Sequence, residues 1–522
     1  MLPPQRQPHW QRWQQLDNQK PNQTQNMDGV DCSRPHLLFR LAIMSDEAQQ
    51  KEEERNRNRS NASKHPDHIA YMGSNWESAD ASKVEQAEVA PYAAARRDEL
   101  AERFAGQTLV FYAGVHKQRA NDTEYRFRPH SAFTHLTGWG KDAVAGSVLE
   151  IVVADSGGIA SEVLYLRPTA SHGSDEFFAN PAIGEFWVGP RPSLEQVSQL
   201  LDIETRDLAT WVEPENALRV GTAGLQSRTA PDDDFALMEA AAELRLIKDD
   251  WEIRQLQQAC DASAVGFANV LRELHRAKKH PRGERVVETA FFAAARELGN
   301  DLGYETIAAA GDHANTLHWI INDGPVNEGD LLLLDAGVEV ESLYTADITR
   351  TIPISGKFTP VQRKIYEAVR EAADAVFAIA KPGVTYAEMH NEAMRVIARK
   401  THEWGLLPDG ITAEASLESN ELWHRRWMVH GTGHMLGLDV HDCSAARRDT
   451  YQDAKLEPGM VFTIEPGLYF HKDDLLVPEE FRGIGVRIED DVLMTEAGPV
   501  NLSAALPRSA DDVEAWMAAA AN

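Results

Sequence analysis

The chain has 522 residues, more than one average domain, so its length predicts two domains with extensions. Hydrophobic residues make up 43% and charged residues 25%, as in a globular protein that buries a sizeable core. With 52 Lys and Arg against 81 Asp and Glu, the formal net charge is −29, which disfavours nucleic acid and anionic membranes as partners because phosphates would be repelled.

Residues 1–65 are rich in Gln, Asn, Arg, Glu and Ser and contain few aliphatic residues. Such a segment cannot bury enough apolar surface to offset the entropy lost on ordering, so we expect a disordered extension. Met44, which precedes the polar run SDEAQQKEEE, is an alternative initiation site. N-terminal sequencing of the native protein would distinguish Met44 from Met1.

Residues 66–242 are predicted to form an α/β domain, because short apolar runs alternate with helical stretches. The expected strands are LVFYAG (109–114), VLEIVVAD (148–155) and VLYLRP (163–168). SLEQVSQLL (193–201) is expected to be a helix with Ser193 at its N-cap. This part of the sequence contains no obvious catalytic cluster.

Residues 243–522 are predicted to form an α+β domain in which helices cover one face of a curved sheet. Helices are expected from Asp249 or Asp250 to about residue 277, over 284–298, over 361–380, and from Thr385, where T-Y-A-E makes a capping box with Glu388. Strands are expected in DLLLLDAGVEV, TADITRTIPI, MVFTIEP and GVRIEDDVLM.

Four carboxylates, Asp335, Asp347, Glu465 and Glu489, lie in or at the ends of these apolar strands. A single acid there is most often a solvated strand terminus. Four acids cannot share an interior unless cations neutralise them, so together they indicate a metal site. Four carboxylates are too many for one catalytic zinc ion and suit two ions about 3.5–4 Å apart. Hard oxygen ligands favour manganese, cobalt or zinc.

The run MVHGTGHMLGLDVHD holds His430, His434 and His441. The first two have the i, i+4 spacing of helical zinc ligands, but Gly431 and Gly433 would each cost about 1 kcal/mol in a helix. The run also lacks the glutamate of H-E-x-x-H. We therefore predict a non-helical loop and reject a zincin.

The motifs LHW, DAG…ADITRT, HGTGHMLGLDVHD, FTIEPGLY and GVRIEDD follow one another between residues 243 and 507. In order and spacing they resemble the creatinase/aminopeptidase family with the pita-bread fold, and most closely its aminopeptidase P (Xaa-Pro aminopeptidase) members. YRFRPHSAFTHLTGW (125–139) is similar to part of that family's N-terminal domain. The resemblance implies an α+β pita-bread catalytic domain preceded by the α/β domain and the extension.

The resemblance also implies the site residues, by position. Asp335 would hold one divalent ion, usually manganese, with cobalt or zinc as alternatives, and His434 and Glu465 would hold the other. Asp347 and Glu489 would bridge both ions. The implied catalytic residues are His318, His430, His441 and Glu465, and the implied contacts to the substrate's proline are His430, His441 and Arg487.

The implied reaction is hydrolysis of the bond between an N-terminal residue and a following proline by a hydroxide that bridges the two ions. Glu465 would relay the proton, and His430 or His318 would stabilise the oxyanion or protonate the leaving group. The substrate amine would approach Asp335 and its ion. The expected partners are peptides with proline in second position and further copies of the chain, as a dimer or tetramer.

Alternative functions share much of this pattern. A prolidase has the same ligands but cuts only Xaa-Pro dipeptides, so a comparison of Xaa-Pro-Yaa with Xaa-Pro separates the two. Methionine aminopeptidase usually lacks such an N-terminal domain, and creatinase lacks the metal. A non-catalytic binding protein on this fold would typically have lost ligands, whereas all five are present here. Peptidase activity that survives a chelator would favour that class.

Cys32, Cys260 and Cys443 are far apart and form neither a C-x-x-C pair nor a disulfide framework, which predicts a reducing, cytoplasmic location. No apolar run approaches the roughly 20 residues needed to span a bilayer, so no membrane partner is expected.

The sequence departs from the family pattern at two places, and both concern local loop shape. The stretch from Asp335 to Asp347 is one residue longer than usual, within EVESLY (339–344), where a turn or bulge can absorb it. Cys443 and Ser444 stand where Val-Gly is common.

Overall fold

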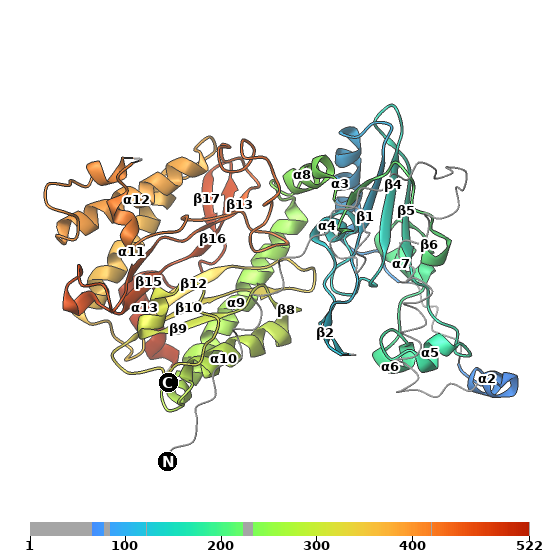
Figure 1. The fold of residues 1–522 in the computed structure, drawn as a ribbon, viewed down its shortest axis with the longest axis horizontal. Helices are drawn as coiled ribbons and strands as arrows, with labels where there is room; N and C mark the ends of the chain where they lie inside the picture. The colour runs from blue at the N-terminus through green and yellow to red at the C-terminus, as the bar shows by residue number, and fades with distance from the viewer. Residues whose placement is uncertain (1–64, 78–83, 122, 223–232, 419, 521–522) are drawn as a thin grey trace, which may run out of the picture. The chain divides into compact units, whose positions relative to one another are not determined.

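The computed structural model describes residues 65–77, 84–121, 123–222, 233–418 and 420–520 (Figure 1). The predicted disordered extension, apart from His65, and the alternative start Met44 lie outside the described residues. Among the described helices, none is long and apolar enough to cross a membrane.

The first half is built on one mixed sheet with the strand order β6-β5-β4-β1-β7. Its strands are β1 (Thr108–Tyr112), β4 (Val148–Val153), β5 (Ile159–Leu166), β6 (Glu204–Asp207) and β7 (Leu218–Val220). The β1–β4 and β4–β5 pairs are antiparallel, and the outer pairs are parallel. The three strands predicted from sequence correspond to β1, β4 and β5.

Helices and short strands surround this sheet. They are α2 (Pro66–Met72), α3 (Ala90–Glu102), α4 (Ser131–Thr137), α5 (Asp175–Ala179), α6 (Glu185–Val188), α7 (Leu194–Leu201), α8 (Phe235–Glu243), β2 (Gln118–Ala120) and β3 (Thr123–Glu124). Ser193 caps α7 as predicted, and Gln196 completes the capping box. Alternate residues of β1 enter different clusters: Leu109 and Phe111 join one, Val110 and Tyr112 the other. Both faces of the sheet are therefore covered.

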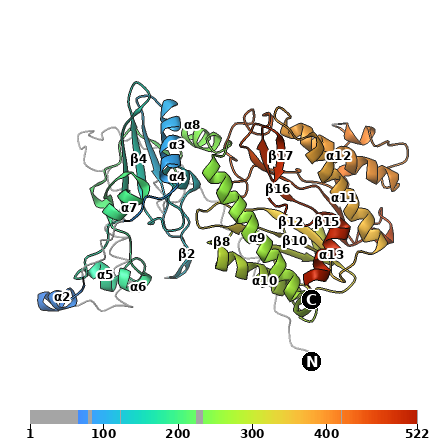
Figure 2. The same ribbon diagram turned by 180° about the vertical axis from the view of Figure 1, so that it is seen from behind.

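Long helices cover the sheets of the second half. They are α9 (Asp250–Ala277), α10 (Gly283–Leu298), α11 (Pro360–Ile379), α12 (Tyr386–Glu403) and α13 (Ala510–Ala520). The predicted caps are present, because Asp249 forms a capping box with Glu252 and Thr385 forms one with Glu388. Figure 2 shows α9 and α10 lying side by side. The sequence analysis did not predict α13.

Two three-stranded antiparallel sheets carry or flank the four carboxylates singled out in the sequence. One has the order β12-β10-β9, with β9 (Ile307–Ala310), β10 (Leu331–Ala336) and β12 (Ile348–Pro353). The other has the order β13-β16-β17, with β13 (Val461–Ile464), β16 (Asp490–Thr495) and β17 (Gly498–Asn501). Two-stranded pairs join β14 (Gly467–Phe470) to β15 (Ile484–Arg487) and β8 (Asp301–Leu302) to β11 (Val338–Glu339). The predicted α+β class is confirmed.

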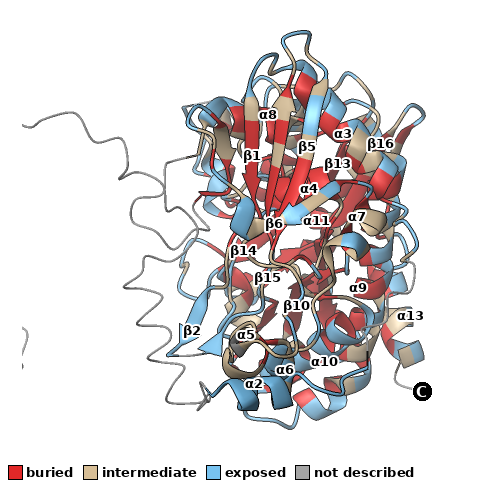
Figure 3. Cartoon of the chain, turned by 90° about the vertical axis from the view of Figure 1, so that its right-hand side faces the viewer, coloured by how far each residue is buried: buried red, intermediate tan, exposed pale blue. Residues whose placement is uncertain are grey.

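Burial differs sharply between these strands and the periphery (Figure 3). Every residue of β10 and of β12 is buried, whereas β2 is exposed throughout and α2 contains no buried residue. Charged side chains in β10 and at the start of β12 are therefore held in the interior, where each needs a partner.

A tight turn leads from β11 toward β12 within EVESLY (339–344). The Leu343 amide donates to the Val340 carbonyl at 2.8 Å, and Leu343 has a left-handed φ of 73°. The leucine side chain is buried, which holds this uncommon conformation in place. The β10–β12 register therefore keeps Asp335 opposite Thr349.

Candidate metal centre

Asp335 and Asp347 come from the β12-β10-β9 sheet. Asp335 lies near the end of β10 and Asp347 immediately precedes β12, so antiparallel pairing brings the two carboxylates together. The Tyr304 hydroxyl lies 2.6 Å from Oδ1 of Asp335 and 2.5 Å from Oδ1 of Asp347. Because a phenol carries one proton, Tyr304 donates to one of them at a time.

Glu465 and Glu489 come from the second sheet. Glu465 directly follows β13, and Glu489 lies between β15 and β16. The Glu489 amide donates to the Thr349 carbonyl at 3.1 Å, and the Thr349 hydroxyl donates to Oε2 of Glu489 at 2.6 Å. Thr349, which lies opposite Asp335 in β12, therefore ties Glu489 to the first sheet.

His434 is positioned by the glycine-rich loop, which is not helical, as predicted. The His434 amide donates to the Thr463 hydroxyl at 3.1 Å, and the Thr463 amide donates to the His434 carbonyl at 2.9 Å. A Cβ on Gly433 would lie 2.1 Å from the Thr463 carbonyl oxygen, so only glycine permits this approach to β13. Nδ1 of His434 lies 3.1 Å from the Met435 carbonyl, which leaves Nε2 available as a ligand.

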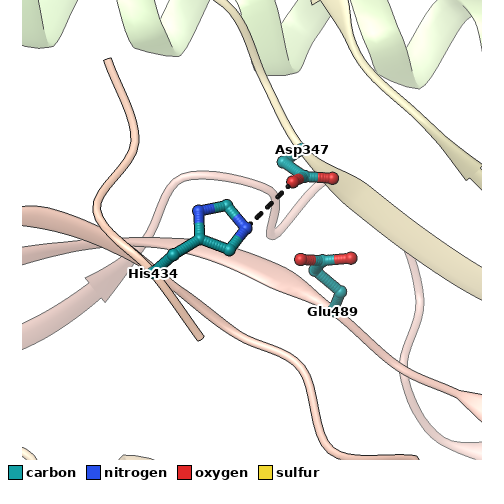
Figure 4. A group of neighbouring side chains, drawn as sticks. All are labelled: Asp347, His434 and Glu489. Atoms are coloured by element: carbon teal, nitrogen blue, oxygen red, sulfur yellow. Dashed lines mark ion pairs between the residues drawn. The ribbon is translucent and has the colours of Figure 1, made fainter. Parts of the chain in front are cut away.

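The side chains of Asp347, His434 and Glu489 converge (Figure 4). One ligand atom from each lies within 4.8 Å of the others. Nε2 of His434 is 3.2 Å from Oδ2 of Asp347 and 3.7 Å from Oε1 of Glu465. These side chains share one space although they come from three separate parts of the chain.

The pKa values of these side chains show that the carboxylates are unfavourable in their charged form unless positive charge is nearby. Burial, then the charges of Asp347 and Glu465, raise the pKa of Glu489 well above its ordinary value. Burial raises the pKa of Glu465 to about 7. Burial would lower the pKa of His434, but its hydrogen bond to Asp347 and the nearby carboxylates raise it to about 9. The carboxylates attract any positive charge at this position.

This donor set fits divalent cations. Three buried carboxylates, the half-buried Glu465 and one imidazole whose Nε2 faces Asp347 supply hard ligands, and cations would remove the mutual repulsion of the acids. Three of the five predicted ligands, Asp347, His434 and Glu489, converge directly. Asp335 shares the Tyr304 hydroxyl with Asp347, and Glu465 lies 3.7 Å from Nε2 of His434.

Arg487, predicted as a contact to the substrate's proline, forms an ion pair with Asp335 and is 4% exposed. Its Nη1 donates to the Tyr469 hydroxyl at 3.0 Å, and its Nε to the Thr349 hydroxyl at 3.1 Å. The guanidinium is thus occupied by protein groups. Tyr304 and Tyr469 were not predicted, and the only sequence signal for Tyr469 was its place in FTIEPGLY.

The three predicted catalytic histidines lie around this centre. Nε2 of His430 is 2.8 Å from the Tyr469 hydroxyl, and its Nδ1 is 3.5 Å from Oε2 of Glu465. Burial and then the Arg487 charge lower the pKa of His430 to about 3, so its ring is neutral at physiological pH. The ring centroids of His434 and His441 are 4.4 Å apart. His318 is exposed, yet close enough for its charge to lower the pKa of both His430 and His441.

Comparison with known proteins places this arrangement among metallopeptidases. The model of metallopeptidase family M24 matches residues 254–496, and that of the aminopeptidase P N-terminal domain matches residues 93–213. Xaa-Pro aminopeptidase 2 of Streptomyces coelicolor is 47% identical over 459 residues, covering 86% of this chain and 95% of its own length. Xaa-Pro aminopeptidase of Escherichia coli is 30% identical over 455 residues, covering 81% and 97%.

Solved structures agree. Zinc-substituted E. coli aminopeptidase P in complex with product has a TM-score of 0.70 and 28% identity, covering 84% of this chain and 99% of its own. Proline aminopeptidase P II from Yersinia pestis has a TM-score of 0.67 and 30% identity, covering 82% and 99%. These matches confirm the resemblance drawn from the motifs in both halves of the chain.

Proposed function

Since this chain belongs to the aminopeptidase P branch of metallopeptidase family M24, we propose that it is a metal-dependent Xaa-Pro aminopeptidase with a dinuclear centre. It removes the residue that precedes proline from the N-terminus of a peptide. The observation that carries this proposal is the convergence of Asp347, His434 and Glu489 within one buried, strongly anionic space.

Five side chains would hold the ions: Asp335, Asp347, His434, Glu465 and Glu489. When bound, two divalent cations would activate water near neutral pH and polarise the scissile carbonyl. Asp347 and Glu489 would bridge both ions, and in support their oxygens lie within 4.8 Å of each other and of Nε2 of His434. Manganese is the proposed ion, because carboxylate oxygens dominate the donor set.

Glu465 moves the proton. One of its oxygens faces His434 at 3.7 Å and the other faces His430 at 3.5 Å, so it can accept a proton beside the metal ligands and pass it toward the substrate side. His430 or His318 would stabilise the oxyanion or protonate the leaving group. For His430, whose ring is neutral, this requires its single N–H to leave the Gly431 carbonyl or the Tyr469 hydroxyl.

His318 and His441 bind the substrate around the scissile bond. Both are exposed, so a peptide can reach them from solvent. His430, His441 and Arg487 would contact the proline ring, while the free amine of the first residue would lie toward Asp335 and the ion that it would hold. Arg487 also fixes Asp335 and the Tyr469 hydroxyl.

Metal analysis combined with a peptide-length series tests the proposal. The purified protein is expected to contain manganese, to lose activity with a chelator, and to regain it when Mn²⁺ is added. It is expected to cleave Xaa-Pro-Yaa and longer peptides faster than Xaa-Pro. Preference for the dipeptide would make it a prolidase, and unchanged cleavage after metal removal would reject the metal mechanism.

Location and assembly complete the proposal. We place the protein in the cytoplasm and as a dimer or tetramer of identical chains, as its family membership suggests. Fractionation of native cells and light scattering of the purified chain test the two statements separately.

A further inference from the structure

Glu284 is a fully buried carboxylate outside the candidate metal centre. It lies in the first turn of α10 and is 0% exposed. Oε1 accepts from the Ala310 amide at 2.8 Å and lies 2.7 Å from Nδ1 of His313. Oε2 accepts from Nε1 of Trp319 at 3.0 Å and from the Gly324 amide at 2.7 Å. Each oxygen therefore has two hydrogen-bond partners.

All four partners belong to one segment, residues 310–324, which leaves β9 and leads toward β10. The segment contains one short 3-10 helix, Gly311–Asn315, and His318 lies near its middle. The Glu284 amide also donates to the Gly324 carbonyl at 3.1 Å. The first turn of α10 thus fixes the segment at its start, at its middle and near its end.

Trp319, the neighbour of His318, is held from two directions. Besides its bond to Glu284, its ring stacks on His313 with centroids 3.9 Å apart. The segment is also closely packed at Gly324, where a Cβ would lie 2.5 Å from Cε1 of His313 and 2.9 Å from Oε2 of Glu284. The backbone around His318 is therefore set by contacts that all meet at one carboxylate.

A carboxylate suits this task better than other side chains, since it only accepts hydrogen bonds and has two oxygens that can each take two donors. Burying that charge is costly unless it is fully bonded, so its presence needs a reason beyond the start of a helix. Ordering a long connection that carries an exposed histidine supplies that reason.

We propose that Glu284 is the positioning residue for His318: it orders residues 310–324 so that the imidazole is held over the reacting bond. This inference rests on the substrate role of His318 in the proposed function. Glu284 touches neither substrate nor the metal ligands, and acts through the segment alone.

The test is a double-mutant cycle of Glu284→Gln with His318→Ala. Glutamine keeps the shape of the side chain but has only one acceptor oxygen. Two of the four donors that bond to Glu284 would therefore face an amide N–H₂ group, which cannot accept their hydrogen bonds. Glu284→Gln is expected to lower kcat/KM by about tenfold or more with metal content unchanged. In the His318→Ala background the same change is expected to lower kcat/KM less than about twofold, because the group being positioned is gone.

Trp319→Phe is the milder variant, since it removes one hydrogen bond and keeps the stacked ring. Its matched control is Trp187→Phe in α6, which likewise removes an indole bond, to the Phe178 carbonyl at 2.7 Å. Trp319→Phe is expected to lower kcat/KM in the wild-type background more than in the His318→Ala background. Trp187→Phe is expected to have the same effect on kcat/KM in both backgrounds.

Equal fold losses from Glu284→Gln in both backgrounds, or no loss in either, would overturn the inference. If Glu284→Gln fails to fold, Trp319→Phe decides in the same way. Full activity of His318→Ala alone would instead remove the role of His318 from the proposed function, so the two failures are distinguishable.

Discussion

Glu489 is 2% exposed and lies among the carboxylates of Asp347, Glu465 and Asp335, and burial followed by those charges raises its pKa well above its ordinary value. The Thr349 hydroxyl at 2.6 Å stabilises one of its oxygens. A residue in this position destabilises the metal-free fold and is useful only when cations are bound.

Glu489→Gln is therefore expected to have opposite effects on activity and on stability. Activity should fall more than about 100-fold because a bridging ligand is lost. The free energy of unfolding of the chelated protein should rise by about 1 kcal/mol, because the substitution replaces one of several acidic groups by a neutral amide. Peptidase assays and chemical unfolding measure the two quantities. Glu496→Gln, an exposed glutamate in the turn after β16, should change neither.

For single residues, the sequence predicted the candidate metal ligands but not the residues that hydrogen-bond to them. Acids that end apolar strands are visible in a sequence, because their burial would be costly without cations. Tyr304 is 31 positions from Asp335, and Asp491, which accepts from the Asp347 amide at 3.0 Å, is 144 positions from its partner. Only tertiary pairing reveals such contacts.

The contact between helices α4 and α9 contains a buried histidine. His135 in α4 is 2% exposed, and its Nε2 lies 3.4 Å from Oε1 of Glu252 in the first turn of α9. Burial and then the Arg96 charge lower the pKa of His135 to about 4. In the unfolded chain the ring titrates near its ordinary value of 6.5.

The unfolded state therefore binds a proton on this ring more readily than the folded state does. The neutral ring's contribution to stability is complete above pH ~6.5 and is lost as the pH falls toward ~4, by about 3 kcal/mol in all. Over this window, wild type should lose more unfolding free energy than His135→Gln. His275→Gln, an exposed position of α9, should follow wild type. Parallel curves for wild type and His135→Gln would contradict the assignment.

Local start signals account for some, but not all, of the predicted helices. The capping boxes of α9 and α12 are visible in the sequence because the cap and its partner are three residues apart. The start of α13 had a similar signal that was overlooked, since the Ser509 hydroxyl accepts from the Asp512 amide at 3.1 Å. The two-residue strand β8 has no pattern long enough to predict it, whereas β11 lies within the predicted strand DLLLLDAGVEV.

In the molecule as a whole, the segment similar to the family's N-terminal domain contacts the loop that carries His441. Nε of Arg128 donates to Glu339 at 2.6 Å, and its Nη2 donates to the Leu438 carbonyl at 2.5 Å. The Ser131 hydroxyl donates to Oδ1 of Asp439 at 2.6 Å. The N-terminal domain thus supports the backbone just before His441.

Arg128→Ala is expected to lower kcat/KM by about tenfold while metal content stays unchanged, because the loop before His441 loses its support. Arg126→Ala is the matched control. Arg126 also joins the two halves, through Asp301 at 2.6 Å, but does not contact that loop. Equal effects of the two substitutions would show that Arg128 contributes only to attachment of the domains.

The four carboxylates are divided between two sheets that are joined by direct hydrogen bonds. Asp335 and Asp347 belong to one sheet, Glu465 and Glu489 flank strands of the other, and Thr349 and Thr351 link the two through 3.1 Å and 2.9 Å bonds to Glu489 and Arg487. The spacing of the acids is consequently a property of the distance between the sheets. A substitution that shifts one sheet against the other would therefore change the spacing of the acids, and with it the affinity for an ion bound among them, without altering any ligand.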